Sequence, residues 1–455
     1  MSDANSLTRG DISRQIRRIG IPVGIGVLFN NLFQVVDTFY AGEFSREALA
    51  ALALSFPIYF IIIGLASGLG TGASALIGNA LGADDREEAA YLAAQGITLT
   101  MLLSLVTATA GIAISPWLYQ ILGATGDGVR FNMSYITPIF QATFCFNLVF
   151  MFHAALSAQG ETRPFRNFLI LGFALNIFLD PWFIYGGWGV PAMGVAGVGA
   201  ATALVQLIGS VVLGLRALRS PLFAEFKPRM LVPDFPRALQ ILRQGAPPAL
   251  DLSTVSIGGF VVTYFISRFG TDVVAAYGVA SRLDGLFWIP LVGLDVATLV
   301  LVAQNNGARR YGRMWQAHNT ALRYGLILMI IGGAFVFVFA YDLVGIFTAE
   351  SAIIETGAVY LRISALAYWA KPLGFIGFAA LRGIKRPMLP MVISMTRMIV
   401  LPAILLYALV ILLGAGLLSI WWTLTLITIV SGFVAWGFVQ RLMPRADSSA
   451  APSAS

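Results

Sequence analysis

Charged residues are scarce in this chain. Asp, Glu, Lys and Arg make up 11% of its 455 residues, whereas 58% are hydrophobic. Soluble domains typically carry about 25% charged residues. The shortage therefore excludes an ordinary soluble globular protein. Continuous apolar runs long enough to cross a bilayer as helices recur along the whole chain. Because these runs do not alternate with polar residues, a transmembrane β-barrel is excluded as well.

Cysteine and histidine are almost missing. A single cysteine, Cys145, cannot form an intramolecular disulfide, and two histidines argue against a histidine-rich metal site. The glycine-rich runs lack the G-K-[S/T] of a phosphate-binding loop, and no nucleotide-binding domain is recognisable. We therefore expect no cofactor and no ATPase domain. The first apolar run follows four arginines and precedes no small-residue cleavage site, which predicts a retained span rather than a signal peptide.

Apolar runs between clusters of charge predict twelve transmembrane helices, and hence an all-α polytopic membrane protein. The spans 238–267 and 274–305 are the least regular, because Asp251, Asp284 and Asp295 interrupt them. The predicted spans are 16–42, 50–79, 91–117, 131–158, 165–186, 193–217, 238–267, 274–305, 317–343, 355–381, 388–413 and 417–440.

Positive charge is distributed unevenly between the two sets of loops. Of the 29 Lys and Arg residues, 22 lie in the termini and the loops after even-numbered spans, and only three lie in the opposite loops. The positive-inside rule then places both termini in the cytoplasm of a multi-pass cell (inner) membrane protein. The bias also accounts for the net charge of +7 without nucleic acid as a partner.

The two halves of the chain resemble each other at an offset of 225 residues. "RIGIP" at Arg18–Pro22 aligns with "RQGAP" at Arg243–Pro247, and "GLGTGASALIGNALGA" from Gly68 aligns with "GLDVATLVLVAQNNGA" from Gly293. Six helices are thus repeated, and an even number makes both copies enter the membrane in the same direction. This predicts two six-helix bundles related by a pseudo-twofold axis, with a central cavity, which is a transporter architecture.

The repeat and the hydrophilic connector near the middle of the chain predict the domain organisation. The predicted parts are a cytoplasmic N-terminal tail 1–15, an amino lobe 16–220, a cytoplasmic linker 221–237, a carboxy lobe 238–441 and a disordered cytoplasmic C-terminal tail 442–455.

Two carboxylates break the symmetry of the repeat. Asp37 aligns with Val262, and Asp180 falls opposite Ala403 or nearby. Counting about 1.5 Å per residue from Arg18 and from Arg166 places both acids roughly 21–28 Å from the cytoplasmic edge. Asn176 lies one turn before Asp180 on the same helix face.

Intramembrane acids are costly, and they usually mark ion or proton pathways. Two carboxylates and an amide at one level offer hard oxygen ligands to a small cation, or a shared site to a proton. The structural alternative is an acid held by helix-end amides or a hydroxyl without any role in transport. We favour the ion or proton site, because two acids occur at matched depth in one lobe only.

The carboxy lobe contains a second group of intramembrane charges, in which Asp251, Asp284, Asp295 and Arg397 are candidate residues for the cavity wall. Pairing of these acids with Arg282, Lys371 or Arg397 is the simplest explanation, because unpaired charge is unfavourable there. The functional alternative is a charge network that binds substrate or helps the lobes close.

Pro22, followed by Gly24 and Gly26, makes the start of the first span a candidate hinge. Proline is also well tolerated at a helix start, so Pro22 could simply begin the helix.

At several places the sequence resembles the multidrug and toxic compound extrusion (MATE) family. The motifs are "VDTFYAG" around Asp37, "LNIFLDPWFIYG" around Asp180, "GVAGVGAAT" from Gly194 and the two "RP" dipeptides. The resemblance implies export of amphiphilic or cationic organic compounds in exchange for H⁺ or Na⁺. It also implies that Asp37, Asn176, Asp180 and Thr202 bind the cation or proton. Na⁺ at Asp37, Asn176 and Asp180 would be the only metal.

One position departs from the NorM-type branch of that family. The branch has a glutamate in the seventh helix, where this chain has Val255, and the nearest acid is Asp251, one turn earlier. The pattern is thus closer to the DinF-like type, with ion coupling in the amino lobe.

The leading hypothesis is therefore a secondary-active exporter of small organic substrates, which is not an enzyme and which we expect to act as a monomer. An alternative is a flippase for a lipid-linked precursor, which would need a cavity rich in cationic residues. A membrane enzyme is a third hypothesis, but paired aspartate-rich clusters, a nucleophile motif and recognisable metal-ligand spacings are lacking.

Overall fold

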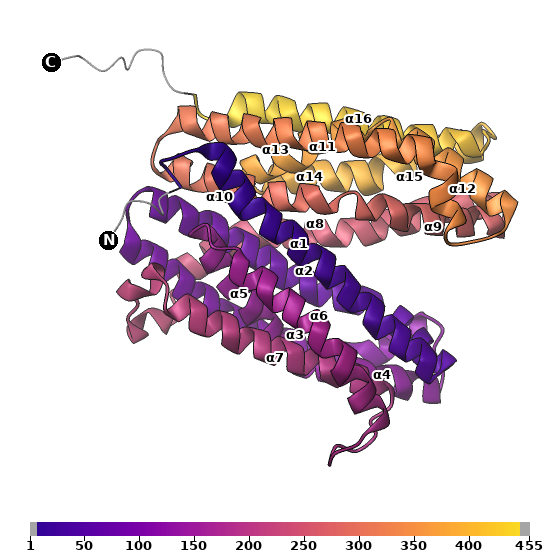
Figure 1. Cartoon of the computed structure of the whole chain (residues 1–455), viewed down its shortest axis with the longest axis horizontal. Helices are drawn as coiled ribbons and strands as arrows, with labels where there is room; N and C mark the ends of the chain where they lie inside the picture. Colours follow the sequence, from indigo (N-terminus) through magenta and orange to yellow (C-terminus); the bar gives the residue numbers. More distant parts are fainter. Residues whose placement is uncertain (1–6, 446–455) are drawn as a thin grey trace. The chain divides into compact units, whose positions relative to one another are not determined.

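The structure is a computed structural model that describes residues 7–445. Its main helices are α1 (Ile12–Phe44), α2 (Arg46–Gly82), α3 (Arg86–Ile121), α4 (Asp127–Gln141), α5 (Thr143–Ala158), α6 (Arg163–Tyr185), α7 (Val195–Leu218), α8 (Phe235–Ile266), α9 (Thr271–Leu286), α10 (Ile289–Gly307), α11 (Tyr311–Gly345), α12 (Ser351–Ala365), α13 (Lys371–Gly383), α14 (Met388–Met395), α15 (Leu401–Leu406) and α16 (Leu417–Leu442). Figure 1 shows them along the chain.

The helices confirm the predicted all-α membrane fold. Ten are long and apolar enough to span a membrane, and two bent pairs raise the number to twelve among residues 7–445. One pair is α4 with α5, bent by 44°, and the other is α12 with α13, bent by 42°. The bends fall near Ala142 and Ala367, which are 225 residues apart, so the repeat extends to the shape of this span.

Span boundaries differ from the prediction in two places. The predicted span 274–305 is interrupted at Phe287 and Trp288, between α9 and α10. Pro290 explains the interruption, because proline cannot donate the backbone hydrogen bond that would continue α9. Helix α1 also begins before the predicted span 16–42, at Ile12. The predicted C-terminal tail 442–455 lies outside the described residues from residue 446 onward.

The chain divides into two compact units, and the division falls inside two helices. The amino unit comprises residues 25–250, and the carboxy unit comprises residues 7–24 with 251–445. The start of α1 therefore belongs with the second repeat, and the start of α8 with the first. The two compact units differ from the predicted lobes, 16–220 and 238–441, at these two segments.

Glycine contacts explain where each helix starts to pack. In the carboxy unit, a Cβ on Gly293 would lie 2.4 Å from the carbonyl oxygen of Gly20, so α1 and α10 touch backbone to backbone. In the amino unit, a Cβ on Gly245 would lie 2.8 Å from the Cα of Leu69, next to Gly68. Gly20 with Gly245 and Gly68 with Gly293 are the pairs that the 225-residue offset predicts. Small residues at such contacts let helices approach closely.

Polar contacts hold the segments that precede α1 and α8. In the carboxy unit, Arg313 Nη1 donates to the carbonyl of Gly10 at 2.7 Å, and Arg310 Nη1 donates to that of Thr8 at 2.9 Å. In the amino unit, Gln95 Nε2 donates to the carbonyl of Met230 at 2.6 Å. These contacts fix the residues that precede α1 and α8.

An ion pair adds to the amino-unit contact. Arg237 Nη2 lies 2.8 Å from Glu88 Oε2, and Glu88 is the repeat counterpart of Arg313. The backbone N–H of Arg237, followed by its guanidinium, holds the pKa of Asp234 below its usual value. Equivalent positions of the repeat, Glu88 and Arg313, therefore bind the chain near the start of α8 and of α1, with opposite charge.

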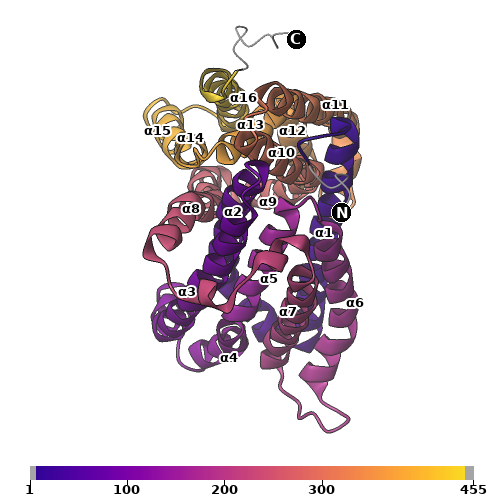
Figure 2. The same ribbon diagram turned by 90° about the vertical axis from the view of Figure 1, so that its left-hand side faces the viewer.

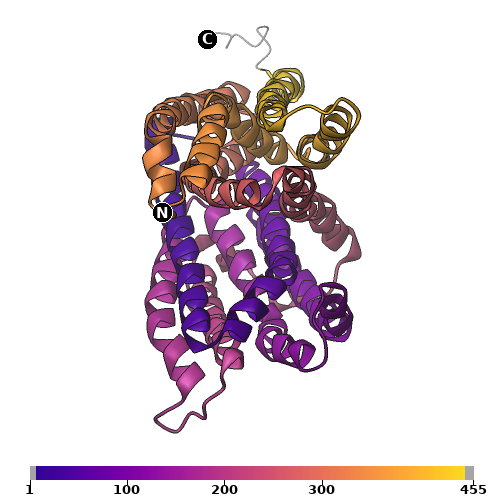
Figure 3. The same ribbon diagram turned by 90° about the vertical axis from the view of Figure 1, so that its right-hand side faces the viewer.

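Neighbouring helices pack in hairpins within each unit. In the amino unit α6 and α7 lie side by side, and the loop 186–194 projects beyond their ends (Figure 3). In the carboxy unit α16 lies beside the span formed by α14 and α15 (Figure 2). Buried aliphatic and alanine side chains fill both units, with the largest fully buried side chain, Trp421, in the carboxy unit.

The glycine contacts lead to a stability prediction. Gly293→Ala places a Cβ 2.4 Å from the Gly20 carbonyl oxygen, so the helices must separate. Overpacking of this kind costs about 1–3 kcal/mol. We expect a lower thermal unfolding midpoint of the purified protein, measured by tryptophan fluorescence in detergent. Gly437→Ala is the matched control, because its Cβ would meet no heavy atom within 4 Å. Equal midpoints for the two variants would contradict the prediction.

Candidate functional site

One side chain, the Asn176 amide, connects the two acids that the sequence singles out in the amino unit. Its Nδ2 donates to Asp37 Oδ1 on α1 and, at 3.0 Å, to Asp180 Oδ2 one turn further along α6. Asn176 and Asp180 are fully buried and Asp37 is 8% exposed. The structure thus brings these three predicted residues into one cluster.

Helices α1 and α6 are also joined directly beside the cluster. The Tyr40 hydroxyl on α1 donates to the carbonyl of Ile177 on α6 at 3.2 Å. Thr202 on α7 lies beside Asp37, and its hydroxyl donates to the carbonyl of Val198 at 3.1 Å. The fourth predicted residue is therefore at the cluster, with its hydroxyl within reach of Asp37 as well.

Two tyrosines complete the surroundings, and sequence reasoning missed both. Tyr59 on α2 and Tyr135 on α4 are close enough for the carboxylate of Asp37 to act on them electrostatically. Their repeat counterparts at offset 225 are Asp284 and Tyr360. The pairing of Tyr135 with Tyr360 was a usable signal, because a tyrosine kept in both halves of an apolar repeat needs a common reason.

The cluster contains acceptor oxygens that receive no hydrogen bond. Asn176 Oδ1 and Asp180 Oδ1 are buried without a hydrogen-bond partner within residues 7–445. A buried acceptor left unsatisfied is unfavourable, and a proton or a small hard cation would relieve this. No group of three or more His, Cys, Asp or Glu side chains able to hold a metal is found in the described chain. The oxygens available are thus those of two carboxylates, an amide and nearby hydroxyls.

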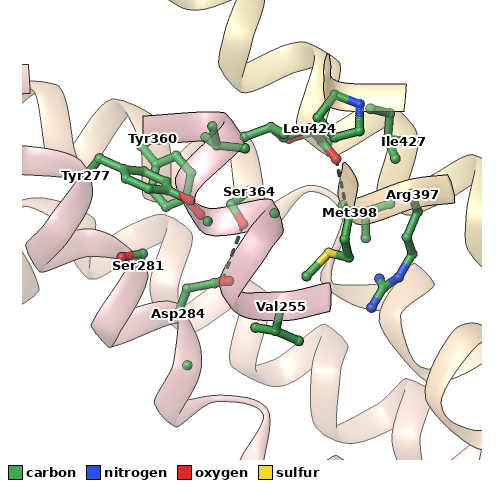
Figure 4. Close-up of a pocket in the computed structure, with 18 of the residues that line it drawn as sticks. Val255, Tyr277, Ser281, Asp284, Tyr360, Ser364, Arg397, Met398, Leu424 and Ile427 are labelled. Atoms are coloured by element: carbon green, nitrogen blue, oxygen red, sulfur yellow. Dashed lines mark hydrogen bonds between the residues drawn. The ribbon is translucent and has the colours of Figure 1, made fainter. Parts of the chain in front are cut away.

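The carboxy unit holds a cavity of about 590 Å³. It lies at the break between α9 and α10 and is lined by residues of α8, α9, α12, α13 and α16 and of the span from α14 to α15. Figure 4 shows Asp284 and Arg397 on opposite sides of it, with Tyr277 and Tyr360 at one end. Its volume lies within the range of about 300–1,000 Å³ typical of small-molecule sites.

Asp284 is the most heavily bonded side chain of this cavity. Lys371 Nζ lies 2.9 Å from its Oδ1 and 3.2 Å from its Oδ2. The hydroxyls of Tyr368 and Ser364 donate to Oδ1 at 2.5 and 3.3 Å. Both members of the ion pair are buried, with side-chain exposures of 7% for Lys371 and 9% for Asp284. Pairing, the simpler of the two sequence-based hypotheses, is therefore found for Asp284.

The other predicted carboxy-lobe residues do not join this pair. Asp295 on α10 pairs with Arg382 on α13. Arg397 lines the cavity, whereas Asp251 does not and acts on Arg397 only electrostatically. Within residues 7–445 neither Asp251 nor Arg397 forms an ion pair within 4.0 Å.

The candidate hinge residue lies close to the division between the units. Pro22 is inside α1, two residues before Gly24, at which the carboxy unit's part of the helix ends. It does not begin the helix, which starts ten residues earlier at Ile12. The equivalent place in α8 carries Pro247 and Pro248, close to the division between Leu250 and Asp251.

Comparison with known proteins gives one consistent family. The model of the family MatE matches this chain twice, over residues 22–182 and 247–408. The chain is 28% identical over 359 residues to the probable multidrug resistance protein YoeA of Bacillus subtilis, covering 77% of this chain and 76% of YoeA. It is 27% identical to an FAD transporter of Shewanella oneidensis, covering 88% and 89% of the two chains.

A solved structure agrees with the fold. It is described as the outward-facing conformation of a multidrug resistance MATE family transporter. The two structures align with a TM-score of 0.88 at 26% identity, over 97% of this chain and 98% of that one.

The buried ion pair leads to a prediction about stability. Lys371→Met leaves the Asp284 carboxylate buried without its counter-ion, and breaking such a pair costs about 3–5 kcal/mol. We expect a strongly lowered thermal unfolding midpoint of the purified protein. The double variant Asp284→Asn with Lys371→Met removes both charges and should recover most of the loss. A double variant as unstable as Lys371→Met would show that the pair is not the cause.

Proposed function

Because the chain belongs to the MatE family of membrane transporters, we propose that it is a secondary-active exporter coupled to an ion gradient through the Asp37, Asn176 and Asp180 cluster. The protein is a multi-pass transporter and not an enzyme. The proposed substrates are amphiphilic or cationic organic compounds, exchanged for H⁺ or Na⁺. We further propose that it works as a monomer in the inner membrane with both termini cytoplasmic.

The coupling proposal rests on one observation: the cluster contains buried acceptor oxygens without a hydrogen-bond partner in the described residues. Two carboxylates share one amide donor, and further acceptors of the same cluster have no partner within the described residues. Two ionised carboxylates repel each other in a low dielectric, so the cluster gains most from a proton or cation. An ion bound there can shift the transporter between its two states only by its differential affinity for them.

The absence of an acid at position 255 supports the DinF-like assignment. Val255 lines the carboxy-unit cavity at the place where the NorM-type branch has its glutamate. The cavity's own acid, Asp284, is already bonded to Lys371, Tyr368 and Ser364. We therefore place ion coupling in the amino unit only.

The first test removes the charge of the cluster. We expect Asp37→Asn or Asp180→Asn to reduce gradient-driven transport to the level of protein-free liposomes. The amide keeps the size of the carboxyl group but cannot release and take up the coupling ion. Transport is measured in proteoliposomes with rhodamine 6G as the substrate, imposing a pH gradient or a Na⁺ gradient alone.

Two further variants make this test specific. Asp127→Asn is the basal control, because the Asp127 side chain is fully exposed at the start of α4. Asp251→Asn should leave the ion dependence largely intact, since Asp251 lies outside the cluster. Wild-type transport by both cluster variants would refute the proposal. Loss of ion dependence in Asp251→Asn equal to that in Asp37→Asn would place coupling in the other unit.

We also propose that α1 bends near Pro22 when the cluster binds its ion. Proline removes a backbone hydrogen bond there, and the segment before it packs with the carboxy unit while Asp37 packs with α6. Loss of charge at Asp37 would weaken its bond to Asn176 and so change how α1 packs on α6.

Distances between spin labels test this hinge. Val35 on α1 and Phe178 on α6 are exposed positions suited to labelling, in a background without Cys145. We expect low pH or added Na⁺ to shift the distance distribution, and Asp37→Asn to remove the response. An unchanged distribution under both conditions, in a protein shown to transport, would exclude the hinge.

A further inference from the structure

The carboxy-unit cavity occupies the repeat position of the amino-unit carboxylate cluster. Val262, which lines the cavity, is the counterpart of Asp37 at offset 225, and Asp284 is the counterpart of Tyr59. Arg397 lies on the span that corresponds to α6, the helix of Asn176 and Asp180. The same scaffold therefore carries acids in one unit and a guanidinium in the other.

Positive charge predominates in the cavity wall. Three lining residues are cationic, Arg282, Lys371 and Arg397, and one is anionic, Asp284. Asp284 is not the counter-ion of the two arginines, because its carboxylate already accepts hydrogen bonds from Lys371, Tyr368 and Ser364. Neither Arg282 nor Arg397 has an ion-pair or hydrogen-bond partner in the described part of the chain. The wall thus carries two guanidinium groups without a counter-ion.

The unsatisfied polar groups of the wall are donors. Arg397 Nε and Trp288 Nε1 are sealed from solvent and lack a hydrogen-bond partner among residues 7–445. Arg397 belongs to the π-helical segment Thr396–Val400, in which the N–H of Leu401 bonds to the carbonyl of Thr396. Such π segments are frequent at functional sites, and Pro402 favours this one because it cannot donate to Met398.

Asp251 is the acid whose charge acts on Arg397. It lies outside the cavity lining and forms no hydrogen bond to the guanidinium. It therefore lowers the cost of the buried charge without filling the donor positions. A charged side chain that lies in a membrane span, lines a cavity and has no ion-pair partner indicates a ligand.

We propose that this cavity binds the acidic group of an amphiphilic organic anion, a carboxylate, sulfonate or phosphate, with Arg397 and Arg282 as its charge partners. A guanidinium matches such groups because its planar fork donates two parallel hydrogen bonds. The body of the ligand would contact Trp288 and Phe375, whose rings lie 5.8 Å apart, edge to face. The site thereby extends the proposed function, on which it rests, to anionic substrates.

Two dyes with the same xanthene skeleton and opposite charge test the proposal. Fluorescein is an anion and rhodamine 123 a cation, so size and aromatic area are nearly matched. Binding is measured by fluorescence polarisation on the purified full chain in phosphatidylcholine nanodiscs, without any gradient. We expect fluorescein to bind at least about tenfold more tightly to the wild-type cavity, the equivalent of about 1.4 kcal/mol. Equal binding of the two dyes, or preference for rhodamine 123, would overturn the proposal.

Arginine variants locate the binding. Arg397→Gln should weaken fluorescein binding about tenfold and leave rhodamine 123 unchanged, whereas Arg397→Lys keeps the charge and should lose less. Arg282→Gln is a second variant, at an exposed position where folding is not at risk, and should weaken fluorescein in the same direction. Arg362→Gln removes the same charge from α12 outside the cavity lining and is the matched control. Unchanged fluorescein binding in both Arg397→Gln and Arg282→Gln would also overturn the proposal.

One further arm identifies the source of the anion. Anionic phosphatidylglycerol added to the nanodiscs identifies a lipid headgroup as the occupant if it displaces fluorescein, and a soluble anion if it does not. Because the binding test needs no ion gradient, it is independent of Asp37. Charge-selective binding with no coupled transport would leave this proposal standing and refute the exporter. Coupled transport without charge-selective binding would support the exporter and refute the anion site.

Discussion

Backbone contact between glycines determines how the helices of the two repeats are distributed. Gly20 meets Gly293 and Gly245 lies against Leu69, so no side chain separates the crossing helices at either place. The first part of α1 is thereby bound to α10, and the first part of α8 to α2. Beyond the crossing each helix packs with its own repeat. That change of partner brings Asp37 to α6 and Val262 to the carboxy-unit cavity.

The same scaffold then holds groups of opposite character. In the amino unit two acids compete for the amide of Asn176, and unsatisfied acceptors remain. In the carboxy unit one acid is fully bonded by Lys371 and its neighbours, and unsatisfied donors remain. Burial makes each imbalance costly, because the free-energy cost of an unpaired polar group is larger in a low dielectric. Together the two sites would let one chain bind a cation in one unit and an organic anion in the other.

Hydropathy and repetition are properties of the chain read in one dimension, and they predicted much of this protein. The twelve spans follow from the apolar runs, and the crossing glycines occur at the offset found by self-alignment. Asp37, Asn176 and Asp180 were predicted as a group because depth and helix spacing can be counted along the sequence. Their contact in the structure agrees with that count.

Which side chains of neighbouring helices contact one another could not be predicted from the sequence in this way. Nothing in the sequence pointed to the pairing of Asp295 with Arg382, or to the place of Tyr59 and Tyr135 beside the acids. The break at Phe287 and Trp288 opens a cavity only because α8 and the span from α14 to α15 face it. By itself the sequence determined which residues enter the membrane and at what depth, since both depend on hydrophobicity and rise per residue. The tertiary structure decided which charges are satisfied and which remain open, because that depends on the side chains that neighbouring helices present to one another.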